Sequence, residues 1–179
     1  MIRSMKKLLV LILIFSINTE TNAQKWQPDF LLPLGPEILL NINNQKLSGF
    51  LNMNIPWHRP GNCAAELSVF YFRVNSIGKV DSIHVEGNLN KVVSAQIIKN
   101  IYKTEGKWRI PNNSKASDNC WFVYPYFLFG NSRPCSESGE VAYRHVYNLY
   151  ISYDNLADTQ DQVGRVIISP NENAKLSEK

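Results

Sequence analysis

The chain has 179 residues, of which 44% are hydrophobic and 11% aromatic, and its formal net charge at pH 7 is +4. This composition excludes an intrinsically disordered protein and predicts a globular domain with a sizeable core. Most of the excess charge lies in residues 1–23, because without them 16 Lys and Arg stand against 14 Asp and Glu. The remainder has no basic stripe, so nucleic acid is not an expected partner.

Residues 1–23 have the layout of a secretory signal peptide. Three basic residues precede an apolar run at residues 8–17, and a small-residue exit ends at Ala23. The apolar run is well short of the ~20 residues needed to span a bilayer, so we expect cleavage after Ala23 and no membrane span afterwards. The processed protein is therefore expected to be periplasmic or secreted.

Residues 24–62 are predicted to form an N-terminal arm rich in Pro and Asn. Its prolines exclude a long helix before Glu37, because proline lacks the backbone N–H and its ring clashes with the preceding turn. Residues 38–42 are compatible with a short strand or with one helical turn. We expect an extended arm that packs apolar side chains onto the domain.

The next segment predicts a β-hairpin. Residues 65–74 are largely apolar on both faces, as in a central strand that is covered on both sides, whereas residues 79–86 carry polar side chains on one face. Gly78 supplies the positive φ that a tight connection between the two strands needs.

Residues 90–105 change to a helical period, because their apolar side chains recur every three or four residues. Asn88 or Asn90 is the expected N-cap, and Gly106 stands where a helix-ending residue with positive φ is favoured. The sequence therefore predicts one amphipathic helix here.

The C-terminal half contains a strand and two shorter patterns. Residues 120–129 hold six aromatic side chains, which predicts a strand, and Pro125 places that strand at a sheet edge or at a bulge. Residues 140–156 fit both periods, with a slight preference for helix, and residues 163–169 fit a last short strand before a polar tail. We expect this extension, residues 131–179, to pack on the domain.

This order of elements predicts an α+β fold with a β-β-α-β unit between N- and C-terminal extensions. With a right-handed crossover the third strand runs parallel to the second, and the first lies between them. The predicted sheet is antiparallel or mixed, with the order second, first, third. One amphipathic helix covers it, with Ile98 and Ile101 facing the sheet. The aromatic strand then lies at an edge, where Pro125 also fits.

The segment FRVNSIGKVDSIHVEG, the helix after it, the Gly106-Lys107-Trp108 exit and Pro111 follow one another in a familiar order. This pattern resembles the C-terminal domain of TonB-like proteins of Gram-negative envelopes, over about residues 63–130. The resemblance implies an exported, non-enzymatic module that binds a protein or peptide partner by adding a strand to its sheet edge. It also implies an outer-membrane transporter as one kind of partner.

The aromatic strand is the predicted partner-binding edge, since an edge strand offers unpaired backbone groups to an extended peptide. The residues assigned to this edge are Trp121, Val123, Tyr124, Tyr126, Phe127 and Phe129. The alternative is that residues 24–62 or 131–179 cover the strand and make it ordinary core. A second functional hypothesis is a structural accessory protein, in which this strand is permanently buried in an oligomer.

The three cysteines test this topology. In the predicted sheet, Cys63 before the first strand and Cys135 after the third meet at one end, whereas Cys120 lies at the other end, roughly 30 Å away. We therefore predict a Cys63–Cys135 disulfide and a buried Cys120 thiol. The rival pairing, Cys120–Cys135, is favoured by proximity in the sequence.

No pattern in the sequence indicates catalysis or metal binding. His58, His84 and His145 have no ligand spacing, and the motifs of nucleophilic, phosphate-binding and zinc enzymes are absent. We expect no cofactor, no metal and no enzymatic activity. An unrecognised hydrolase is the least favoured alternative.

Overall fold

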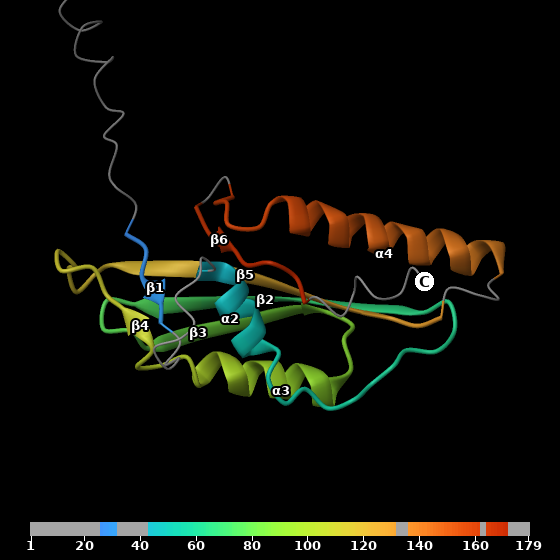
Figure 1. Ribbon diagram of the computed structural model, residues 1–179, viewed down its shortest axis with the longest axis horizontal. Coiled ribbons are helices and arrows are strands. Elements are labelled where there is room, and N and C mark those ends of the chain that lie inside the picture. The colour runs from blue at the N-terminus through green and yellow to red at the C-terminus, as the bar shows by residue number, and fades with distance from the viewer. Residues whose placement is uncertain (1–25, 32–42, 132–135, 162–163, 172–179) are drawn as a thin grey trace, which may run out of the picture.

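The computed structural model describes residues 26–31, 43–131, 136–161 and 164–171, and shows an α+β fold with three helices and two sheets (Figure 1). The signal peptide, residues 38–42 and the last residues of the polar tail lie outside the described ranges. The described elements are β1 (Asp29–Phe30), α2 (Asn43–Leu51), β2 (Ala65–Asn75), β3 (Val80–Gly87), α3 (Lys91–Tyr102), β4 (Trp108–Arg109), β5 (Asn119–Phe129), α4 (Glu137–Asn155) and β6 (Val166–Ile167).

The predicted hairpin is confirmed as β2 and β3, and its turn is held by one side chain. The Asn75 Oδ1 atom accepts hydrogen bonds from the N–H groups of Ile77 and Lys79, both at 3.1 Å. Gly78 has φ +76°, which a residue with a Cβ adopts at a cost. The turn therefore depends on Asn75 and Gly78, two residues whose turn preference can be recognised from the sequence alone.

The predicted helix is confirmed as α3. Asn90 is its N-cap, and the Asn90 side chain accepts hydrogen bonds from the N–H groups of Val92 and Val93. Ile101 is fully buried as expected, but the expectation for Ile98 was too strong, because that side chain is only half-buried at the margin of the core.

The larger sheet has the strand order β3-β2-β5-β6. β2 pairs antiparallel with both β3 and β5, which confirms the predicted order of the first three strands. β6 adds to β5 in parallel, with Phe122 opposite Val166 and Val123 opposite Ile167. The expectation that β5 is an edge strand is therefore wrong where β6 lies beside it.

Helices cover both faces of this sheet, so the expectation of a single covering helix was incomplete. Figure 1 shows α3 and α4 on opposite sides of the strands, and α2 shares the main buried cluster with α3 through Leu47 and Leu51. α4 confirms the helical alternative for residues 140–156. α2 corrects the expectation of a wholly extended arm, although the arm does pack on the domain through Phe30, Leu47 and Leu51, which are buried.

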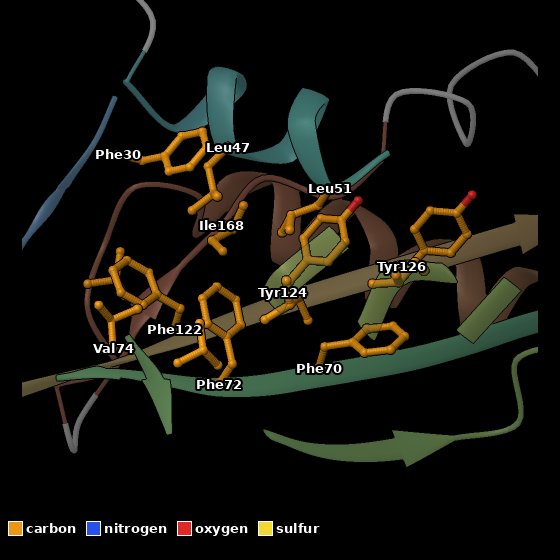
Figure 2. Packing of buried hydrophobic residues seen from close by; sticks show 14 of the residues in the cluster. Phe30, Leu47, Leu51, Phe70, Phe72, Val74, Phe122, Tyr124, Tyr126 and Ile168 are labelled. Atoms are coloured by element: carbon orange, nitrogen blue, oxygen red, sulfur yellow. The ribbon is translucent and has the colours of Figure 1, made fainter. Parts of the chain in front are cut away.

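The main core lies between the sheet and the α2–α3 layer. Figure 2 shows Phe72 and Phe122 side by side, with Phe70, Tyr124 and Tyr126 further along the sheet and Leu51 of α2 next to Tyr124. The rings of Phe72 and Phe122 stack with centroids 5.2 Å apart. The aromatic residues of β2 and β5 thus form the centre of the hydrophobic core.

Candidate partner-binding edge

The six residues predicted to form the binding edge are mostly interior. Val123, Tyr124, Tyr126 and Phe127 are buried, while Trp121 and Phe129 are half-buried. The Tyr124 hydroxyl donates to the Asn52 Oδ1 atom at 2.9 Å. Burial raises the pKa of Tyr126 to about 12, and it raises the pKa of Tyr124 well above its usual value. These side chains therefore serve as core, as the alternative interpretation expected.

The backbone of β5 is also occupied, by the segment 166–171. The Ile168 N–H donates to the Val123 carbonyl at 2.8 Å. Further along, the Asn171 side chain acts like a strand residue, because its Oδ1 accepts from the Phe127 N–H and its Nδ2 donates to the Phe127 carbonyl, both at 2.8 Å. An added peptide would have to displace this segment, whose Val166, Ile167 and Ile168 are buried.

Replacing Asn171 by Ala should lower the free energy of unfolding by about 1–3 kcal/mol, because the buried N–H and C=O groups of Phe127 lose their partners. Asn171→Asp keeps the acceptor but places a buried carboxylate oxygen against the Phe127 carbonyl, so at pH 7 it should be at least as destabilising as Asn171→Ala. Urea unfolding measures both changes. A loss below about 0.5 kcal/mol for Asn171→Ala would show that the side chain does not close this edge.

α4 covers part of the second face of β5. The Tyr150 ring packs edge-on against Phe127 with centroids 5.4 Å apart, and Tyr143 and Tyr147 lie against Phe129. The rest of α4 is largely exposed. The aromatic strand is therefore buried by segments of its own chain, and its burial does not require an oligomer.

β3 is the last strand on the other side of the sheet. The direction in which the backbone N–H and C=O groups of β3 point can be traced through the register, starting from Pro125 on β5. Val123 and Phe127 direct backbone groups away from β2, since those groups bond to residues 168 and 171. Because this direction alternates along a strand, Pro125 also faces away from β2. Its partner in the register is Val69, so Val69 directs its backbone N–H and C=O toward β3.

Val69 lies opposite Glu86 in the β2–β3 register. Glu86 therefore bonds to β2, and the alternate residues Ile83 and Val85 direct their N–H and C=O groups outward. Within the described residues no strand lies beside β3 on that side. We call these outward backbone groups of Ile83 and Val85 the β3 edge.

The β3 edge is closed to a partner strand at both ends. The Val80 N–H donates to the Glu105 Oε1 atom at 3.0 Å, so a carboxylate occupies one end. At the other end Gly87 has φ +134° and approaches β2 so closely that a Cβ would lie 2.1 Å from the Leu67 carbonyl oxygen. The length that remains suits a short extended segment.

The two sides of the β3 edge differ in chemistry. On the α3 side, Ile83 and Val85 pack half-buried against the core, and Ile98 and Tyr102 lie one helical turn apart on α3. On the other side, His84 is exposed and its Nε2 lies 3.0 Å from the Glu86 Oε1 atom. An incoming strand would meet an apolar side and a polar, ionisable side.

The structure describes only part of the expected disulfide. Cys63 is disulfide-bonded, and the Cys120 thiol is buried. Cys135 lies outside the described residues, so the Cys63–Cys135 pairing stays a prediction. His58 pairs with the Glu66 carboxylate at 2.9 Å. Among the described residues no group of three or more His, Cys, Asp or Glu side chains is arranged to hold a metal ion.

The chain matches no family model, no curated protein and no solved structure at a significant level. Of the helices that the structure describes between residues 43 and 161, none has the length and hydropathy that a bilayer crossing requires.

Proposed function

We propose that the protein is an exported, non-enzymatic binding module of a bacterial envelope that holds an extended segment of a partner protein along the β3 edge. The observation that carries this proposal is the outward direction of the backbone groups of Ile83 and Val85, beside which the described residues place no strand. Strand addition satisfies such groups with main-chain hydrogen bonds, and the flanking side chains supply specificity.

The resemblance to the TonB C-terminal domain supports the class of function, since that family adds partner strands to its sheet. In this chain the segment 166–171 occupies the edge of the third strand of the β-β-α-β unit. We therefore propose the opposite edge, β3, as the binding site. An outer-membrane transporter with an extended terminal segment is one partner that this resemblance implies.

The proposal is tested by closing the β3 edge without breaking the sheet. Val85→Pro removes an outward N–H and leaves the β2–β3 hydrogen bonds in place, because proline is tolerated at edge positions that do not donate to the ladder. Val85→Ile keeps the N–H and is the matched control. Wild type and both variants are used to capture proteins from envelope extracts, and captured proteins are identified by mass spectrometry.

We expect a partner that wild type and Val85→Ile retain and that Val85→Pro binds about tenfold or more weakly. Circular dichroism and urea unfolding check that Val85→Pro remains folded. If every captured protein binds Val85→Pro as well as wild type, strand addition at the β3 edge is wrong.

A further inference from the structure

The outer side of α3 and the loop before β2 carry more positive than negative charge, although Glu66 lies between them, with one carboxylate oxygen on His58 and the other on the Asn90 N–H. Residues 52–65 and 88–104 contain no Asp or Glu, and they hold four cationic residues, Arg59, Lys91, Lys99 and Lys103. The three lysines are exposed. The whole processed chain is close to neutral, so this concentration of charge is a local feature of one face.

The position of Lys91 does not serve the stability of the helix. Lys91 is the first residue of α3; that first turn holds no acidic residue, but the Glu66 carboxylate accepts from the N–H of the N-cap Asn90 at 2.8 Å and supplies a negative charge at this end of the helix. The partial positive charge of a helix N-terminus disfavours a cation there.

Large apolar side chains are exposed among these charges. Trp57 is 89% exposed and Val92 is 63% exposed, and Met53 and Tyr102 are about half exposed. Trp57 is held outward by a fixed loop, because Ile55 packs against the core before it and His58 pairs with Glu66 after it. An indole kept in solvent on a fixed loop is available for an external contact.

The loop and the helix lie next to each other. The Asn100 side chain on α3 donates to the carbonyl oxygens of Leu51 and Met53, at 2.8 and 2.7 Å. Figure 1 shows the connection after α2 passing α3 along the margin of the molecule opposite α4. The loop that carries Trp57 and the helix that carries the lysines are therefore neighbours, and we call their exposed side chains together the α3 face.

We propose that the α3 face docks on an anionic lipid surface. Lysines attract acidic headgroups, and tryptophan and tyrosine side chains favour the boundary between headgroups and acyl chains. The exposed apolar side chains on α4 lack this charge, since Glu137, Glu140 and Asp154 lie on or beside that helix. This docking goes beyond the proposed peptide binding at the β3 edge and does not depend on it.

The test is co-flotation of the processed chain with vesicles of phosphatidylcholine that do or do not contain phosphatidylglycerol. We expect binding only to the phosphatidylglycerol vesicles and release at about 0.5 M salt, where screening is short-ranged. Replacing Lys91, Lys99 and Lys103 by Gln should weaken binding on the order of a hundredfold, at about fivefold per lysine. The matched control is Lys79→Gln with Lys115→Gln, two exposed lysines elsewhere, which should bind like wild type.

Trp57 provides an independent readout. The fluorescence difference between wild type and Trp57→Phe should shift to shorter wavelength on phosphatidylglycerol vesicles. Trp57→Ala should weaken binding, whereas Ile77→Ala, at an exposed position in the β2–β3 turn, should not. Absence of wild-type binding to the anionic vesicles, or equal binding by the triple variant, overturns the proposal. Binding to polyglutamate in solution but not to vesicles also overturns it and assigns the face to an acidic protein.

Discussion

Replacing Phe122 by Ala is expected to lower the free energy of unfolding by about 3–5 kcal/mol. Phe122 is 2% exposed and lies where β5, β6 and the α2 layer meet. Its ring contacts Phe72 and Trp108, with centroid separations of 5.2 and 4.9 Å. Truncation removes both contacts and leaves a cavity that rigid strands on either side fill only in part.

Phe129→Ala is the matched control for this substitution. Phe129 is at the end of the same strand, is half-buried and packs on the opposite face against α4. Its truncation should lower the free energy of unfolding by about 1–2 kcal/mol. Urea unfolding of both variants gives the comparison, and equal losses would show that the main core is not centred on Phe122.

Gly87→Ala is expected to destabilise the fold by about 2–5 kcal/mol, for two independent reasons. The φ of Gly87 is +134°, which side chains disfavour, and its added Cβ would lie 2.1 Å from the Leu67 carbonyl oxygen and 2.6 Å from the Ser68 Cα. Both neighbours are backbone atoms of β2, so relief requires the two strands to separate.

The same substitution at Gly49 should have the opposite sign. Gly49 lies inside α2, and a Cβ added there meets nothing within 4 Å. Gly49→Ala should therefore stabilise the protein by about 0.5–1 kcal/mol, because alanine favours the helix and restricts the unfolded chain. Thermal and urea unfolding compare the two variants. A Gly87→Ala protein as stable as wild type would contradict the observed approach of β3 to β2.

Those parts of the fold that local chemistry determines were predictable from the sequence. Alternation in residues 65–86 indicated β2 and β3, Gly78 indicated the turn between them, and Asn90 indicated the start of α3. The order of the first three strands followed from the handedness of the crossover. These features depend on residues close together in the chain, so a single sequence displays them.

The segments that cover the sheet were not predictable in the same way. α2 has the sequence NNQKLSGFL, in which few apolar residues repeat and Asn is frequent, so its helical pattern is weak. β6 is two residues long. Asn171 closes the edge of β5 with a side-chain amide, and nothing in its local sequence distinguishes that role from a polar tail residue.

This difference explains why the aromatic strand was expected to be open along its whole outward edge. Pro125 indicated a sheet edge or a bulge, and aromatic composition correctly indicated a strand; in the structure the backbone of Pro125 faces away from β2. The occupant of that outward side comes from residues more than forty positions later in the chain, as the Phe127–Asn171 contact shows. Identifying the available edge required the arrangement of the whole chain.

Residue-resolved amide hydrogen exchange tests the central claim, that β3 and not β5 is the available edge. In the free protein we expect fast exchange at Ile83 and Val85 and slow exchange at Phe127, whose N–H is bonded to Asn171. With a captured partner bound, the Ile83 and Val85 amides should become protected while the Phe127 amide stays slow. Fast exchange of the Phe127 amide in the free protein, followed by its protection on binding with Ile83 and Val85 unchanged, would contradict this account and return the site to β5.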